Sequence, residues 1–138
     1  NILFQALGEV AQEFDMHFEC EDPKRFFSKS ARAWFAIRPS QPSTWYIAFE
    51  FGAGDWMTLE VGLVWDEAHR KTRKAKEQLP IFRKKPNDLW FHGWDYVKNG
   101  DWSTQYLLNM ANNVEEFKQF YRDLIGSILE NITPEKLS

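Results

Sequence analysis

The chain has a single cysteine, Cys20, among its 138 residues, so it contains no pair of thiols for an intrachain disulfide. One thiol fits a reducing compartment, and we expect a cytoplasmic protein. No apolar run approaches the roughly 20 residues of a membrane span, and no cationic segment precedes an apolar one as in a signal peptide. Because the chain begins with Asn1 rather than methionine, we expect a processed chain or a piece of a longer protein.

The sequence also lacks the patterns of the common catalytic sites. His17, His69 and His92 lie far apart, and no Cys/His cluster is present to hold zinc. There is no glycine loop for phosphates, no dinucleotide fingerprint and no Ser/His/Asp arrangement. We interpret His92 as a packed or edge residue and Cys20 as structural. These absences leave open whether the protein is an enzyme.

Aromatic residues are what the chain has in excess. They make up 17% of it, with seven tryptophans and twelve phenylalanines. Each buries a large area, and the length suits one ordinary domain, so residues 1–138 are expected to fold as a single unit. Most of the tryptophans are predicted to lie in the core. The alternative is that some stack on the bases of a single-stranded nucleic acid.

Hydrophobic periodicity predicts helices near both ends. Leu3, Leu7, Val10 and Phe14 have helical spacing, and Ser103 is a plausible cap for a short helix after it. The longest predicted helix follows Asn113, a predicted N-cap with Glu116 in the capping-box position. Its apolar stripe is expected to lie against a sheet and comprises Val114, Phe117, Tyr121, Leu124, Ile125, Ile128 and Ile132.

Four segments between these helices read as strands: "ARAWFAIRP", "TWYIAFEFG", "WMTLEVGLVW" and "DLWFHGWDYV". The second and third alternate apolar and polar residues and are joined by "GAGD", which predicts an antiparallel hairpin. Residues 15–30 are mixed and favour no element. The sequence therefore predicts an α+β fold, with a mostly antiparallel sheet of about four strands packed against N- and C-terminal helices.

The charge is concentrated in "HRKTRKAKEQLPIFRKK", residues 69–85. Its eight basic residues and one acid give it a charge of +7, so the rest of the chain carries −10 against a total of −3. Such a cluster can bind a phosphate backbone or an acidic protein partner, and it can equally be an exposed polar helix or a solvated loop. The candidate nucleic-acid-binding residues are Arg70, Lys71, Arg73, Lys74, Lys76, Arg83, Lys84 and Lys85.

Two carboxylates are weaker candidates for a metal site. Glu50 and Glu60 fall on the polar face of the predicted hairpin, where near the turn they are expected to be diagonal cross-strand neighbours. Two close carboxylates can hold Mg²⁺, which prefers oxygen ligands. The alternative is a surface salt bridge with Arg32 or Arg38 of the preceding strand.

The order of "WYIAFEF", "LEVGLVW", a polar connection, "LWFHGWDYV", "WSTQYLLNM" and "EEFKQFYRDLIGSILENI" resembles the C-terminal half of bacterial PD-(D/E)XK nuclease-superfamily domains. The resemblance runs from Ala31 to Ile132 and includes Gly62 of the second hairpin strand. It implies association with nucleic acid, and Mg²⁺ if the domain is catalytic.

The chain departs from that family at the catalytic motif, an acid-x-Lys on a strand. Asp22-Pro23-Lys24 has the combination in a predicted turn, and the strand positions Glu50 and Glu60 are not followed by the lysine. No catalytic residue is carried over. The leading prediction is a nuclease-like, nucleic-acid-associated domain whose catalytic segment lies upstream or is lost. The alternatives are a non-enzymatic protein-interaction module of a phage or mobile-element type, and a small-ligand binder with a Trp-lined cleft.

Overall fold

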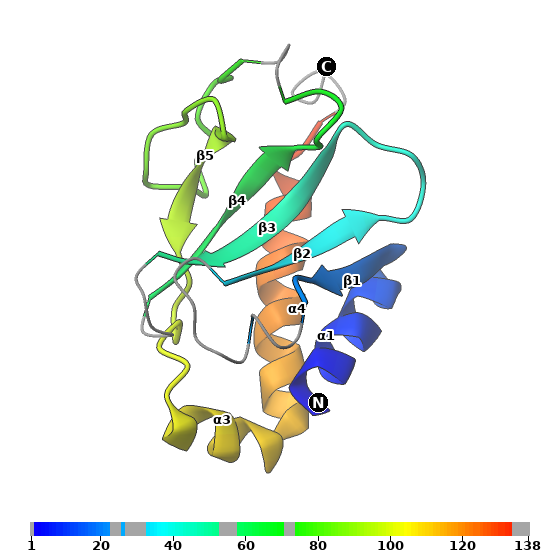
Figure 1. The fold of residues 1–138 in the computed structure, drawn as a ribbon, viewed down its shortest axis with the longest axis vertical. Coiled ribbons are helices and arrows are strands. Elements are labelled where there is room, and N and C mark those ends of the chain that lie inside the picture. The colour runs from blue at the N-terminus through cyan, green and yellow to red at the C-terminus, as the bar shows by residue number, and fades with distance from the viewer. Residues whose placement is uncertain (1, 23–25, 27–32, 53–57, 71–73, 134–138) are drawn as a thin grey trace.

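A five-stranded antiparallel sheet with helices on one side forms the fold in the computed structural model (Figure 1). The structure describes residues 2–22, 26, 33–52, 58–70 and 74–133. The strands follow one another in the sheet in the order in which they occur in the chain. They are β1 (Met16–Cys20), β2 (Trp34–Pro39), β3 (Trp45–Phe51), β4 (Leu59–Trp65) and β5 (Trp90–Tyr96).

Strand β1 was not predicted, and it raises the strand count from four to five. Its sequence MHFEC alternates apolar and polar residues, but five residues are too few to distinguish a strand from a loop by pattern alone. Asp15, with a φ of 56°, lets the chain leave helix α1 and enter the strand directly. The strand then pairs along its whole length with β2, from Met16 opposite Pro39 to Cys20 opposite Phe35.

The helices are close to those predicted: α1 (Ile2–Glu13), α3 (Thr104–Ala111) and α4 (Val114–Glu130). Ser103 caps α3 by accepting a hydrogen bond from the Tyr106 N–H at 3.1 Å. Asn113 stands at the N-cap position of α4, but its side chain donates to the Asn109 carbonyl oxygen at 2.8 Å and makes no cap bond. Asn113 therefore links the two helices and does not form the predicted capping box.

Helix α4 runs behind the sheet, with α1 beside it (Figure 1). Its buried residues are Phe117, Tyr121, Ile125 and Ile128, which confirms the predicted stripe. Two ion pairs join the two helices at the surface, Lys118 to Glu9 at 2.9 Å and Arg122 to Glu13 at 2.6 Å. The main hydrophobic core thus lies between the sheet and these two helices.

Aromatic rings fill much of this core. The rings of Phe35 and Phe49 stack with centroids 4.6 Å apart, and Trp65 stacks on Phe91 at 3.6 Å. Trp102, which follows β5, lies 5.5 Å from Phe35 and is 1% exposed. The prediction that most tryptophans are core residues is only partly correct. Trp65 and Trp102 are fully buried there, and Trp45 is partly buried against it, but three others lie on the opposite side of the sheet: Trp34, Trp90 and Trp94.

Candidate functional site

The side of the sheet that faces away from α4 has its own aromatic cluster. Phe49 of β3 packs against Tyr121 of α4, with centroids 5.9 Å apart. Because side chains alternate along a strand, Tyr46, Ala48 and Glu50 point the other way. We call this side the pocket face, and none of the described helices packs on it. Its residues are Trp34, Ala36, Tyr46, Ala48, Glu50, Glu60, Gly62, Val64, Trp90, Trp94 and Tyr96.

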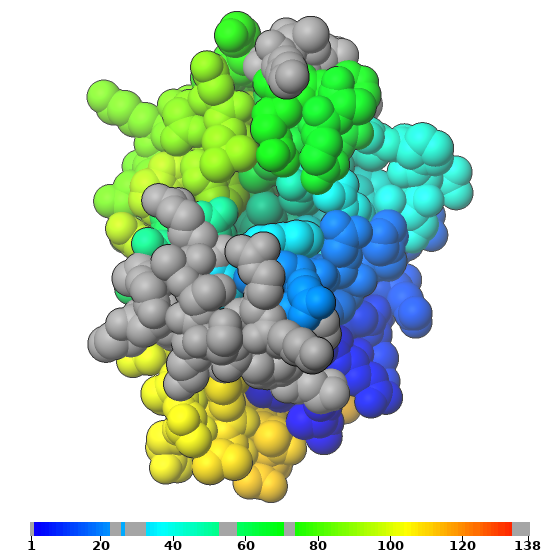
Figure 2. All heavy atoms as spheres, viewed as in Figure 1, coloured from blue at the N-terminus to red at the C-terminus, as the bar shows by residue number. Residues whose placement is uncertain are grey.

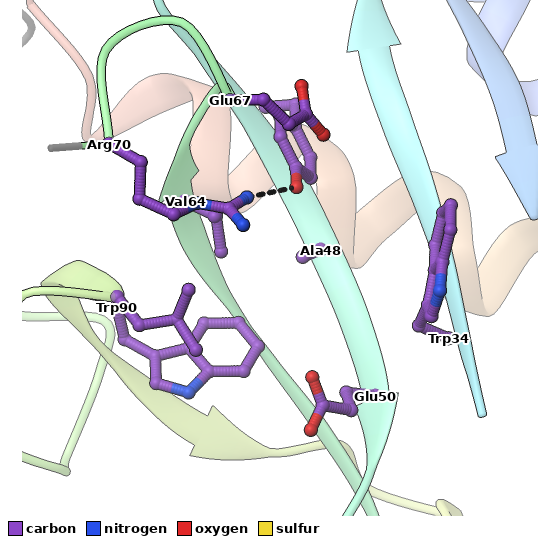
Figure 3. Close-up of a pocket in the computed structure, with 9 residues that line it drawn as sticks. Trp34, Ala48, Glu50, Val64, Glu67, Arg70 and Trp90 are labelled. Carbon is purple, nitrogen blue, oxygen red and sulfur yellow. Dashed lines mark hydrogen bonds between the residues drawn. The ribbon is translucent and has the colours of Figure 1, made fainter. Parts of the chain in front are cut away.

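A hollow of about 290 Å³ lies in the middle of this face, and Figure 2 views the molecule from this side. Ala48 and Val64 form its floor, and Trp34 of β2 and Trp90 of β5 stand on either side (Figure 3). Small residues between two indoles explain why the sheet is hollow here. The remaining lining residues are Tyr46, Glu50, Glu67, Arg70 and Leu89.

Gly62 fixes the position of the Trp90 wall. A Cβ on Gly62 would overlap the Trp90 ring and would approach the Gly93 carbonyl oxygen to 2.8 Å. The missing side chain therefore lets the Trp90 indole lie across β4, where Figure 3 shows it nearly face-on. Trp34 is seen edge-on in the same view, with one ring face turned toward the hollow. The two indole rings are therefore not parallel to each other (Figure 3).

Arg70 occupies one end of the pocket. Its Nη2 donates to the Tyr46 hydroxyl at 3.0 Å and to the Trp65 carbonyl oxygen at 3.3 Å. The Arg38 guanidinium lies over the Tyr46 ring, 3.9 Å from its centroid. Burial, opposed by Arg70, raises the pKa of Tyr46, so this hydroxyl remains protonated at neutral pH. The pocket therefore ends in a guanidinium and a neutral hydroxyl.

The two glutamates of the predicted hairpin are cross-strand neighbours, but directly opposite each other rather than diagonal. Glu50 and Glu60 are direct cross-strand partners, and the Glu60 carboxylate occupies the space that a side chain at Gly52 would fill. Arg38 bonds to Glu19 and Glu67 at 2.9 Å and 3.1 Å rather than to this pair. Arg32, the other suggested partner, lies outside the described residues, and its salt bridge stays a prediction.

No metal centre is assembled around these carboxylates in the part of the chain that the structure describes. No three His, Cys, Asp or Glu side chains gather there as ligands. His92 is buried and its Nδ1 lies 2.5 Å from the Glu77 carbonyl oxygen, which agrees with a packed residue. Burial and the neighbouring acids raise the pKa of the Cys20 thiol, which disfavours the reactive thiolate.

The part of the basic segment from Lys76 to Lys84 runs along the outer edge of β5. The Lys76 and Leu79 N–H groups donate to the carbonyl oxygens of Phe91 and His92 at 2.6 Å and 3.0 Å. Lys84 and Trp94 exchange two backbone bonds, at 3.0 Å and 3.3 Å. Residues 74–85 form no helix, which excludes the exposed-helix interpretation for them. Their bonds to β5 and the burial of Leu79 and Phe82 also exclude a fully solvated loop.

Gly93 makes the close approach of this segment possible. It has a φ of 97°, and a Cβ there would come within 2.6 Å of the Lys84 carbonyl oxygen. Only glycine adopts this conformation readily and leaves space for the passing backbone. Gly93, within β5, thus lets the basic segment pack closely against this strand.

The structure separates the eight candidate basic residues into different environments. Arg70 lines the pocket, and Arg83 bonds to Asp95 through Nε and Nη2. Lys84 places its Nζ 5.5 Å from the centroid of the Tyr96 ring. Lys74 and Lys85 are exposed and Lys76 is half-buried, while Lys71 and Arg73 lie outside the described residues. Of the described cations, Arg70 and Lys84 therefore lie at the pocket face, and Arg83 is held in an ion pair.

The Arg83–Asp95 pair predicts a pH dependence of stability. Burial acts to raise the pKa of Asp95, but hydrogen bonds from the Arg83 guanidinium and from backbone N–H groups outweigh it and leave the pKa below its ordinary value of 3.8. The stabilisation is therefore complete above the ordinary pKa and is lost as the pH falls toward the folded one. We expect the difference in unfolding free energy between wild type and Asp95→Asn to shrink below about pH 4.

Urea unfolding at several pH values between neutrality and about pH 3 measures this difference. The Arg83→Gln variant is the control, because it removes the same pair from the other side and should show the same convergence. A difference that stays constant across the range would mean that the pair does not stabilise the fold.

Sequence reasoning offered a Trp-lined cleft as one alternative but did not say which tryptophans would line it. Alternation puts Tyr46, Ala48 and Glu50 on one side of the hairpin, and "LWFHGWDYV" has apolar residues at both alternating sets of positions. These two patterns indicate that the pocket face of the sheet is also partly apolar. The meeting of Trp34 with Trp90 depends on sheet order, which the alternation does not specify.

None of the helices that the structure describes combines the length and the apolar character of a membrane span. Comparisons of the chain with protein-family models, with curated proteins and with solved structures found no match. The resemblance to PD-(D/E)XK nuclease-superfamily domains stays a prediction. Function is therefore inferred from the geometry of the pocket face and the segment beside it.

Proposed function

We propose that the protein binds nucleic acid, with the phosphate backbone held along the basic segment 69–85 and with the bases turned toward the pocket face. One observation carries this proposal: the backbone of residues 76–84 lies along β5, and its Lys84 stands next to an aromatic residue of the pocket face. Lys84 and Tyr96 illustrate the arrangement, since the ammonium group lies close to an exposed ring. Aromatic rings bordered by cations are what sequence-tolerant binding of nucleic acid requires.

The distribution of charge supports an anionic ligand at this place. The segment carries +7 while the rest of the chain carries −10. An anionic chain is therefore repelled by most of the molecule and attracted to this edge, which favours association in one orientation. The resemblance to nuclease-superfamily domains points to the same ligand class, and a cytoplasmic location agrees with the single cysteine. The proposal concerns binding and assigns no cleavage, because no catalytic residue is identified.

Salt dependence tests the role of the lysines. Each phosphate contact that is lost lowers the slope of log K against log salt by about 0.9 for duplex DNA and about 0.7 for a single strand. Replacing Lys74, Lys84 and Lys85 together by glutamine is therefore expected to lower the slope by roughly 2 to 3. Fluorescence anisotropy with labelled DNA at several salt concentrations measures it.

Lys98→Gln is the control, because Lys98 is exposed but belongs to the turn after β5 and not to the segment. Its slope should match that of the wild type. All variants should keep the wild-type Tm, since exposed charges contribute little to stability. Equal slopes for the triple variant and the wild type would contradict the proposal.

A protein-interaction module is the second candidate, and a specific observation favours it. Leu89 and Tyr96 are 38% and 45% exposed on or beside the pocket face, and exposed aromatic and aliphatic groups of this kind occur at protein interfaces. An acidic protein partner would use the same cations. Absence of binding to any nucleic acid at low salt would favour this candidate.

A further inference from the structure

We infer that the pocket between Trp34 and Trp90 receives one unpaired base, so that the protein prefers single-stranded nucleic acid to duplex. This inference rests on the proposed function and makes it more specific. Phosphate contacts alone bind either form, because both carry the same backbone. A pocket that takes a base discriminates between them, because a base in a duplex is already paired and stacked.

The shape of the pocket fits a single ring system. Its volume of about 290 Å³ lies near the lower end of the range for small-molecule sites. The face of the Trp34 indole that turns toward the hollow provides a stacking surface, and the Trp90 indole closes the opposite side (Figure 3). The floor of Ala48 and Val64 leaves the space between them empty of side chains. A flat ring can therefore stack on Trp34 and touch Trp90.

The polar groups of the pocket favour a base over an apolar side chain of a protein partner. The five N–H donors of the Arg70 guanidinium suit acceptors on a base edge. Its hydrogen bonds to Tyr46 and to the Trp65 carbonyl oxygen both use Nη2. Its Nε is buried with no acceptor in that part of the chain. A leucine or phenylalanine in the pocket would leave these donors facing an apolar group, which costs free energy.

The charges favour a base over a phosphate inside the pocket. Glu50 and Glu67 both line it, and carboxylates repel a phosphate at short range. A base is neutral and enters without this penalty. The phosphates are then directed outward to the lysines beside β5, where Lys84 stands next to Tyr96. The Tyr96 and Trp94 rings, 5.3 Å apart, extend the aromatic surface along the strand beyond the pocket.

The test compares a short labelled single-stranded DNA of mixed sequence with the duplex of the same sequence, by fluorescence anisotropy. The wild type is expected to bind the single strand at least tenfold more tightly. Trp34→Ala should weaken single-strand binding by roughly 5- to 150-fold, as the loss of one base-stacking contact does, and should leave duplex binding unchanged. Trp34→Phe should restore most of the affinity, since it keeps a ring.

Ala48→Leu provides a second variant that removes no aromatic group. It fills the floor of the pocket and should weaken single-strand binding like Trp34→Ala, so a folding defect in one variant does not decide the result. Leu108→Ala is the control, because Leu108 is 58% exposed on α3, outside the pocket face. Circular dichroism confirms that each variant is folded.

The outcomes separate this inference from the proposed function. Equal binding of the two forms, or equal weakening of both by Trp34→Ala and Ala48→Leu, overturns the pocket as a base site while nucleic-acid binding stands. Absence of binding to both forms overturns the proposed function and with it the inference, and leaves the pocket face to a protein partner. Selective loss of single-strand binding in both variants, with rescue by Trp34→Phe, supports the inference.

Discussion

Replacing Trp102 by alanine is expected to destabilise the protein by about 3–5 kcal/mol, the cost of truncating a buried aromatic side chain. Trp102 belongs to no helix or strand, yet it is 1% exposed. Its ring lies 5.4 Å from Phe51, 5.5 Å from Phe35 and 6.3 Å from Phe117. It therefore joins two strands of the sheet to helix α4, and its loss leaves a cavity that all three elements line.

Urea denaturation followed by circular dichroism measures this cost as a change in the midpoint at constant slope. Trp102→Phe keeps part of the ring contact and should lose less. Leu108→Ala, at an exposed position of α3, should stay within about 0.5 kcal/mol of the wild type. A cost below about 1 kcal/mol for Trp102→Ala would mean that the core closes around the missing ring or that α4 does not depend on it.

The Gly93→Ala variant should be destabilised by about 1–3 kcal/mol from backbone strain alone, because alanine at a φ of 97° is held in a sparsely populated conformation. The added Cβ would also meet the Lys84 carbonyl oxygen at 2.6 Å, and backbone atoms on both sides must shift to relieve this contact. We expect the two-bond pairing of Lys84 with Trp94 to break. The basic segment should then separate from β5.

Two measurements check this expectation. Urea denaturation gives the change in stability, and limited digestion with trypsin reports the accessibility of the peptide bond between Lys84 and Lys85, which should be cleaved faster in the variant. Gly8→Ala is the matched control, because Gly8 lies in α1 and its added Cβ would only meet the Phe18 Cβ at 3.9 Å. It should stabilise the protein by about 0.5–1 kcal/mol. Equal effects of the two substitutions would contradict the role assigned to Gly93.

Elements with a clear hydrophobic period could be predicted from the sequence. The hairpin of β3 and β4 follows from alternation, and the pairing of Glu50 with Glu60 follows from the hairpin. Helix α4 follows from its apolar stripe. Strand β1 was missed because a five-residue pattern is weak evidence, and the sheet context that stabilises it is not local.

The basic segment shows where local reasoning fails for a physical reason. Its composition favours a helix, yet the side chains of Leu79 and Phe82 are buried in the core. The backbone of the segment forms hydrogen bonds to β5 instead of to itself. Tertiary contacts override the local preference here. Gly93 lets the Lys84 backbone come close to β5. This role could not be predicted from the sequence, because it depends on which backbone passes the glycine in the folded structure.

The sequence predicted which kinds of residue form the candidate site, but not how these residues are arranged in space. The sequence identified the cations and suggested that tryptophans on a sheet can stack on bases, but Trp34 and Trp90 are separated by more than 50 residues of chain. They line one pocket because β2 and β5 enclose two strands whose residues at this point are small. The role of Arg70 as a pocket residue, in contrast to Arg83 in an ion pair, also depends on the folded structure.

The position of the basic segment also bears on how the protein avoids self-association. As the last strand of the sheet, β5 would present a row of unsatisfied backbone groups, which is a template for pairing with strands of other molecules and for aggregation. The segment occupies several of these groups at Phe91, His92 and Trp94. Its like charges repel a second copy that approaches the same edge. The segment therefore protects the sheet from edge-to-edge association with other molecules, both by occupying the edge and by its charge.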